Sequence, residues 1–263
     1  MSAKSLSLFD RFLGWLGRRM AGKLQEQTSG YNPYTPSDFI TLSKTLQPGD
    51  VLLVEGNERI SNVIKYLTQS TWSHAAVYVG DALPIPEGET ERPRLIEANV
   101  GDGCIAVPLS KYTTYNTRIC RAVGLSDAER ATVVNFMIGK LGLQYDLRNI
   151  FDLLRYFFPI PFPVRWRRRM LSVGSGDPTR GICSSLIAQA YQAIHYPILP
   201  KIRVEGASGY YARQEIYHIR HHSLFAPRDF DLSPFFEVVK PTIASGFNSH
   251  DLVWEEALES LPE

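Results

Sequence analysis

The sequence predicts an α+β fold built on one antiparallel sheet, and three observations support this. Short apolar segments at residues 51–54, 74–80, 94–98, 104–108 and 118–123 have the length and composition of strands. Turns that contain proline or glycine separate them, which is typical of a meander of antiparallel neighbours. Helical periodicity lies before, between and after these strands, and 263 residues suffice to bury one sizeable core.

Residues 1–24 are predicted to form an amphipathic helix. Its apolar side carries Leu6, Phe9, Leu13, Leu16 and Met20, and its basic side carries Lys4, Arg11 and Arg18. Such a helix either lies in a lipid interface or docks on its own domain or on a partner. Residues 25–45 follow it and are predicted to be a linker, because they are rich in Ser, Thr, Pro, Gly and Tyr.

The predicted globular domain covers residues 46–240 and opens with a turn, Pro48-Gly49-Asp50, that leads into the first strand. Residues 58–69 are predicted to be helical, since apolar residues recur there at a spacing of three or four. Ser126 is the expected N-cap of a helix that runs to Lys140, with acidic residues in its first turn.

The second half of the chain is predicted to be mainly helical. We expect helices at residues 147–157, 183–194 and 207–217, then strand and turn at 224–240 and a loose acidic tail at 241–263. Residues 150–169 join an aromatic segment to an arginine cluster. This segment either rests on an anionic membrane, covers a substrate groove, or is a packed helix followed by a solvated basic loop.

Composition narrows the class of protein. The net charge of +1 gives no overall field for nucleic acid, so we expect no nucleic-acid partner. Three cysteines form no disulfide or zinc pattern, and the histidines near residue 220 lack a second ligand cluster, so we expect neither metal nor cofactor. The sequence shows no signal peptide or membrane span, and we expect a cytoplasmic protein, peripheral on the inner face of the membrane.

The candidate chemistry lies in Cys183, His74 and Glu97. Cys183 follows Gly181 at the start of a predicted helix, whose positive end favours a thiolate. His74 opens an apolar strand and Glu97 lies within the next one, where a carboxylate usually has a partner. Each residue alone also fits a structural role: a buried thiol, a histidine bonded to the backbone, or the solvent face of a strand.

The order of these short motifs resembles the circularly permuted branch of the NlpC-type, papain-like cysteine hydrolases, the YiiX/YebB-like group. The matching segments are Pro48-Gly49-Asp50-Val51, Ser73-His74, Ile96-Glu97-Ala98, Gly142-Leu143-Gln144-Tyr145-Asp146 and Gly181-Ile182-Cys183-Ser184. The permuted order is also similar, more distantly, to lecithin:retinol acyltransferase, which has a second histidine where this chain has Glu97.

The resemblance implies that Cys183 is the nucleophile, His74 the base and Glu97 the residue that orients the base. We further expect Tyr145, Ser73 and Ser184 to contact substrate. The implied reaction is hydrolysis or transfer of an acyl group from an amide, ester or thioester through a thioester on Cys183. The expected substrate is an acyl or peptide compound, lipid-linked if residues 4–24 and 150–169 contact a membrane. The alternative is a membrane-associated binding module that keeps the fold without turnover.

Overall fold

The computed structural model describes residue 33 and residues 38–99, 102–144, 182–206, 213–218, 225–244, 246–248 and 250. Its centre is a six-stranded sheet with the order β4-β3-β2-β1-β5-β8, in which all neighbouring strands are antiparallel. The strands are β1 (Val51–Val54), β2 (His74–Tyr78), β3 (Pro93–Asn99), β4 (Gly103–Pro108), β5 (Thr117–Ala122) and β8 (Phe236–Val239). The α+β class and the antiparallel sheet predicted from the sequence are therefore confirmed.

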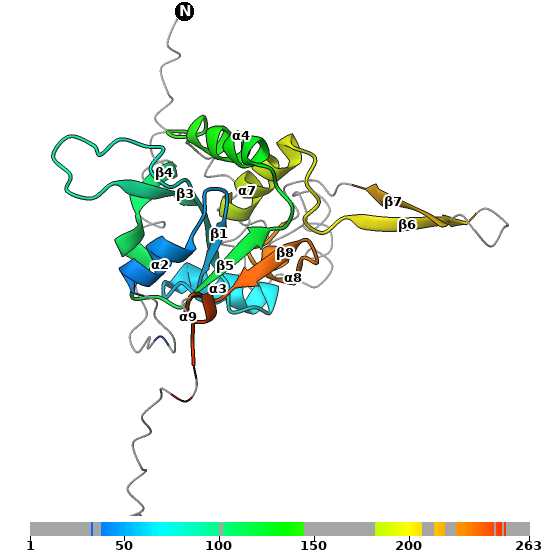
Figure 1. The fold of residues 1–263 in the computed structure, drawn as a ribbon, viewed down its shortest axis with the longest axis horizontal. Helices are drawn as coiled ribbons and strands as arrows, with labels where there is room; N and C mark the ends of the chain where they lie inside the picture. The colour runs from blue at the N-terminus through cyan, green and yellow to red at the C-terminus, as the bar shows by residue number, and fades with distance from the viewer. Residues whose placement is uncertain are drawn as a thin grey trace, which may run out of the picture.

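Both faces of the sheet are covered, because side chains alternate between two apolar clusters along each strand. In β1, Val51 and Leu53 belong to one cluster, and Leu52 and Val54 belong to the other. Helices α4 (Asp127–Ile138) and α7 (Ile182–Ala193) contribute to the first cluster. Helix α2 (Phe39–Thr45) and the 3₁₀ helix η1 (Leu109–Tyr112) contribute to the second (Figure 1).

Two helices match their sequence predictions closely. Helix α3 spans Arg59–Thr68 within the predicted range 58–69. Helix α4 begins after Ser126, whose hydroxyl accepts from the Glu129 N–H while the Glu129 carboxylate accepts from the Ser126 N–H. This capping box satisfies donors that the first turn of a helix otherwise leaves unpaired.

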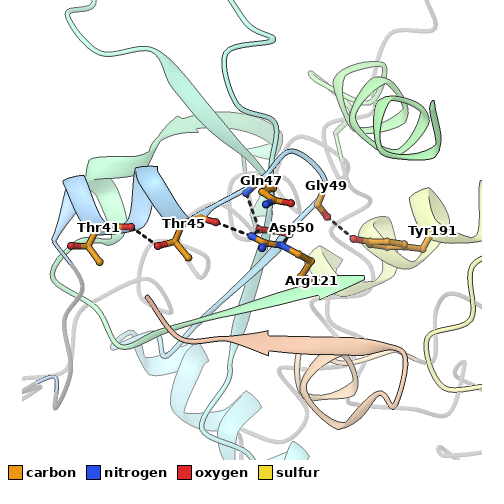
Figure 2. Close-up of polar contacts among 7 residues, drawn as sticks. All are labelled: Thr41, Thr45, Gln47, Gly49, Asp50, Arg121 and Tyr191. Atoms are coloured by element: carbon orange, nitrogen blue, oxygen red, sulfur yellow. Dashed lines mark hydrogen bonds and ion pairs between the residues drawn. The ribbon is translucent and has the colours of Figure 1, made fainter. Parts of the chain in front are cut away.

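The turn that opens the domain is tied to three elements. Figure 2 shows Arg121 of β5 donating to both oxygens of Asp50, at 2.9 and 2.6 Å, and to the Thr45 carbonyl at 2.7 Å. The Tyr191 hydroxyl of α7 donates to the Gly49 carbonyl at 2.5 Å. We call these contacts the Asp50 clamp; they link the end of α2, the sheet and the helix that carries Cys183.

Three predictions about the elements are wrong in part. Residues 39–45 form α2 instead of linker, because the Asp38 carboxylate caps the Thr41 N–H and Leu42 is buried. The predicted helix 207–217 is replaced from residue 213 by strand β7 (Arg213–His218), which pairs with β6 (Lys201–Gly206) in a hairpin that projects from the body (Figure 1). The segment 224–240 contains a short helix, α8 (Arg228–Leu232), before β8.

The C-terminal part and several predicted segments need separate mention. A short helix, α9 (Pro241–Ala244), lies within the predicted tail. The predicted helices at 4–24 and 147–157, the segment 150–169 and most of the acidic tail lie outside the described residues. Within the described part of the chain, no helix combines the length and apolar composition needed to cross a bilayer.

Candidate active site

The structure brings His74, Cys183 and Glu97 together, although β2, α7 and β3 supply them separately. His74 is the first residue of β2, and Cys183 is the second residue of α7, which packs against β2. Ala76 of β2 pairs with Glu97 of β3, so His74 and Glu97 lie diagonally on the same face of the sheet. The site therefore lies at the end of β2, where a helix N-terminus meets the sheet.

Cys183 is buried and hydrogen-bonded to the imidazole of His74. Burial acts to raise the pKa of its thiol. The charge of His74, the hydrogen bond to His74 and backbone N–H bonds from Ala75 and Ser184 outweigh burial and lower the pKa. The position in the first turn of α7 acts in the same direction, because a helix N-terminus favours a negative charge.

Glu97 is a fully buried carboxylate that accepts hydrogen bonds at both oxygens. Asn99 Nδ2 and Lys111 Nζ donate to Oε1 at 2.8 and 2.6 Å. The Tyr112 hydroxyl donates to Oε2, and His74 Nε2 lies 3.2 Å from the same atom. An ionised carboxylate offers about four acceptor positions and no proton, so this set of partners suits the charged form of Glu97.

This arrangement also fixes the tautomer of His74. An ionised Glu97 can only accept, so Nε2 carries a proton toward Oε2, and Nδ1 is the nitrogen left for the thiol of Cys183. A histidine held in this way can take the thiol proton and keep it as an imidazolium.

The charges of the three groups support one another. Burial acts to lower the pKa of His74, but the negative charges of Cys183 and Glu97 and hydrogen bonds to both raise it to about 10. Burial acts to raise the pKa of Glu97, and His74 and Lys111 hold it well below its usual range. The geometry therefore favours a thiolate on Cys183, an imidazolium on His74 and a carboxylate on Glu97. These groups can act as the nucleophile, the acid and base, and the orienting group, respectively.

The three residues expected to contact substrate have different positions. The Ser73 hydroxyl is buried and accepts from the Gly56 N–H at 2.9 Å. The Ser184 hydroxyl is buried and donates to the Phe225 carbonyl at 2.7 Å. Both hydroxyls bind backbone, whereas Tyr145 lies outside the described residues. Contact with substrate stays a prediction for all three residues.

Sequence reasoning missed Asn99, Lys111 and Tyr112 as partners of Glu97. Asn99 lies two residues after Glu97 in the same strand, so strand periodicity places both side chains on the same face. This periodicity is the sequence pattern that could have predicted the contact. Lys111 and Tyr112 belong to η1, which follows β4, and no local pattern indicates that η1 returns to β3. The Tyr112 ring also lies 6.1 Å from the His74 ring between centroids.

The other thiols have a different environment. Burial raises the pKa of Cys104 to about 11, with a smaller contribution from Glu97. Burial likewise raises the pKa of Cys120 well above its ordinary value. Among the described residues, no cluster of three or more His, Cys, Asp and Glu side chains suits a metal ion.

One family model matches part of the chain. Residues 45–157 match the family described as permuted papain-like amidase enzyme, YaeF/YiiX, C92 family. This range contains His74 and Glu97 and ends before Cys183. The match confirms the predicted resemblance to a circularly permuted papain-like family and indicates a cysteine hydrolase. It leaves the more distant likeness to lecithin:retinol acyltransferase without support.

One solved structure aligns with the chain. The crystal structure of metalloprotein yiiX from Escherichia coli O157:H7 aligns with 15% sequence identity and a TM-score of 0.44. The alignment covers 74% of this chain and 97% of that chain. No curated protein matches the sequence.

Proposed function

We propose that the protein is a cysteine amidase that cleaves an amide bond through a thioester on Cys183. The observation that carries this proposal is the continuous chain of contacts from the Cys183 thiol through His74 to Glu97. The contact with His74 stabilises the thiolate and the imidazolium together, which is the state that a thiol nucleophile requires.

The reaction follows from these positions. The Cys183 thiolate attacks the amide carbonyl, so a C–S bond forms and the carbonyl oxygen becomes an oxyanion. The first turn of α7 and the Cys183 N–H are the expected donors to this oxyanion. The C–N bond then breaks as His74 gives its proton to the leaving nitrogen. Neutral His74 next removes a proton from water, and the hydroxide oxygen attacks the thioester and releases the acid and Cys183.

The substrate is the finer part of the proposal. The family description names an amidase, which favours an amide over an ester or thioester. The amphipathic pattern of residues 4–24 favours an acyl donor presented at a lipid surface, and a lipid-linked amide satisfies both observations. Acyl transfer to an acceptor other than water uses the same thioester and remains the second outcome of this chemistry.

Thiol reactivity tests the proposal without a known substrate. The protein is treated with iodoacetamide between about pH 5 and about pH 10, and labelled peptides are quantified by mass spectrometry. We expect Cys183 to react at pH values where Cys104 and Cys120 do not, because its pKa is lowered and theirs are raised.

The controls separate an activated thiol from an accessible one. His74→Ala removes the partner of the thiolate and should slow labelling of Cys183 near neutral pH by roughly tenfold or more. His250→Ala changes an exposed histidine and should leave the rate unchanged. Equal labelling of Cys183 in the wild type and in His74→Ala would instead indicate a binding module that keeps the fold without an activated thiol.

A further inference from the structure

The 3₁₀ helix η1 places a lysine against the buried carboxylate of the site. Leu109 and Tyr112 are buried and anchor η1 to the sheet, and Lys111 lies between them. The Lys111 side chain is 38% exposed, whereas the Glu97 side chain is fully buried. The Lys111 ammonium reaches Glu97 Oε1 at 2.6 Å and lies 5.2 Å from the centre of the Tyr112 ring.

The titratable groups that interact electrostatically with His74 and Glu97 come from several elements. They are Cys183 of α7, Glu58 ahead of α3, Lys111 and Tyr112 of η1, and Cys104 of β4. Tyr112 and Cys104 are neutral near pH 7, because burial and Glu97 raise the pKa of each. Glu58 is half-buried, and burial raises its pKa as well. Besides the His74 imidazolium, Lys111 is therefore a second cation in direct contact with Glu97, and it balances the negative charge of Glu97 when His74 and Cys183 form an ion pair.

We propose that Lys111 is a positioning residue that, through Glu97, sets the pH range in which Cys183 is a thiolate and His74 an imidazolium. This inference rests on the proposed function. A fixed positive charge stabilises the thiolate and opposes the imidazolium, so it moves the titration of both groups to lower pH. Lys111 thereby offsets part of the negative charge that Glu97 places beside the Cys183–His74 pair.

Loss of Lys111 affects charge more than geometry. Asn99, Tyr112 and His74 still donate to Glu97 when Lys111 is absent, so the carboxylate keeps its orientation. If Lys111 only held Glu97 in its orientation, its loss would shift the titration of His74 in the opposite direction. If Glu97 turned away, His74 would lose its counter-ion and titrate at lower pH, while Cys183 would titrate at higher pH.

The experiment compares wild type with Lys111→Met, Lys111→Gln and Lys111→Arg. The pH dependence of iodoacetamide labelling of Cys183 reports the thiol. The ring nitrogens of His74, followed by NMR in ¹⁵N-histidine-labelled protein and assigned with His74→Ala, report the imidazole. Circular dichroism confirms that each variant is folded. Lys44→Met removes an exposed lysine from the last turn of α2 and is the control for net charge.

We expect both titrations to move to higher pH in Lys111→Met and Lys111→Gln, by on the order of one pH unit, since the lysine is partly exposed and screened. Below the thiol midpoint this makes labelling of Cys183 about tenfold slower. Lys111→Arg and Lys44→Met should keep the wild-type titrations.

Unchanged titrations in Lys111→Met and Lys111→Gln overturn the inference. A lower titration midpoint for His74 together with a higher midpoint for Cys183 also overturns the inference. That result would mean that Lys111 only orients Glu97. Either result leaves the proposed function intact if wild-type Cys183 still reacts as a low-pKa thiol that depends on His74. An ordinary thiol titration in the wild type overturns both proposals.

Discussion

At the scale of single residues, the site depends on which groups donate hydrogen bonds to Glu97 and which accept them. Glu97 receives donors at both oxygens, and this makes the charged carboxylate the form that fits its surroundings. His74 then has a defined tautomer, and Cys183 has a base at hydrogen-bonding distance. The carboxylate therefore acts through the histidine and never contacts the thiol in this arrangement.

Glu97→Gln tests that role. The amide keeps the shape of the side chain but replaces one acceptor oxygen with a donor group, which conflicts with the donors around it. We expect the pKa of His74 to fall from about 10 toward its ordinary value. Turnover of an amide substrate should fall by roughly 10²–10⁴-fold, the usual contribution of acid–base catalysis.

The measurement for Glu97→Gln is kcat/KM together with the NMR titration of His74. Glu97→Asp is the companion variant, because it keeps the charge and shortens the reach. A Glu97→Gln enzyme with wild-type kcat/KM and an unchanged His74 titration would contradict the orienting role of Glu97.

At the scale of elements, the Asp50 clamp explains why the motif that opens the domain belongs with the site. Asp50 binds Arg121 of β5, and the neighbouring Gly49 accepts from Tyr191 of α7 (Figure 2). Gly49 has φ of 92°, a left-handed conformation that suits glycine, and its N–H bonds the Tyr78 carbonyl of β2. The clamp thus joins the helix of Cys183 to the strand of His74.

Tyr191→Phe tests the link between α7 and the turn. The ring packing persists, but the buried Gly49 carbonyl loses its donor, so we expect the free energy of unfolding to fall by about 1–2 kcal/mol. Urea denaturation followed by circular dichroism measures the change. Tyr66→Phe is the matched control, because Tyr66 is 75% exposed. Equal stability of Tyr191→Phe and wild type would show that the bond contributes nothing.

The same scale shows where sequence patterns succeed. Ser126 and Glu129 form a complete capping box, so the start of α4 follows from residues three apart. Strands β2 to β5 follow from runs of apolar residues between turns. Residues 213–217, predicted as part of a helix, belong to β7 because this segment pairs with β6, and a pairing between segments cannot be read from either one alone.

At the scale of the whole molecule, both faces of the sheet are covered. The site combines residues from both faces at the end of β2. Cys183 belongs to the apolar cluster under α4 and α7. Glu97 alternates with Ile96 and Ala98 of that cluster and therefore faces the opposite side, with Tyr112. The position of His74 at the end of β2 lets it contact both groups.

The amphipathic pattern of residues 4–24 supports a proposal about membrane association. We propose that residues 4–24 bind a lipid surface, on the amphipathic pattern of that segment. Removal of residues 1–24 should then lower sedimentation with anionic vesicles by about tenfold or more, because apolar burial and basic charge are both lost.

The membrane experiment has two controls. Turnover of a water-soluble amide should be unaffected by removal of residues 1–24, since the described site uses none of them. Vesicles of zwitterionic lipid should bind the full chain more weakly than anionic vesicles. Binding that is equal with and without residues 1–24 would contradict the lipid role and favour docking on protein.

The sequence by itself determined the class of fold, most strand positions, the start of α4 and the order of His74, Glu97 and Cys183. These follow from local rules: alternation, turn chemistry, capping and motif order. Only the tertiary structure decided that the Cys183 thiol meets His74 and that Lys111 and Tyr112 converge on Glu97. The physical reason is that such contacts join residues brought together by strand pairing and by packing of both sheet faces, which no short segment encodes alone.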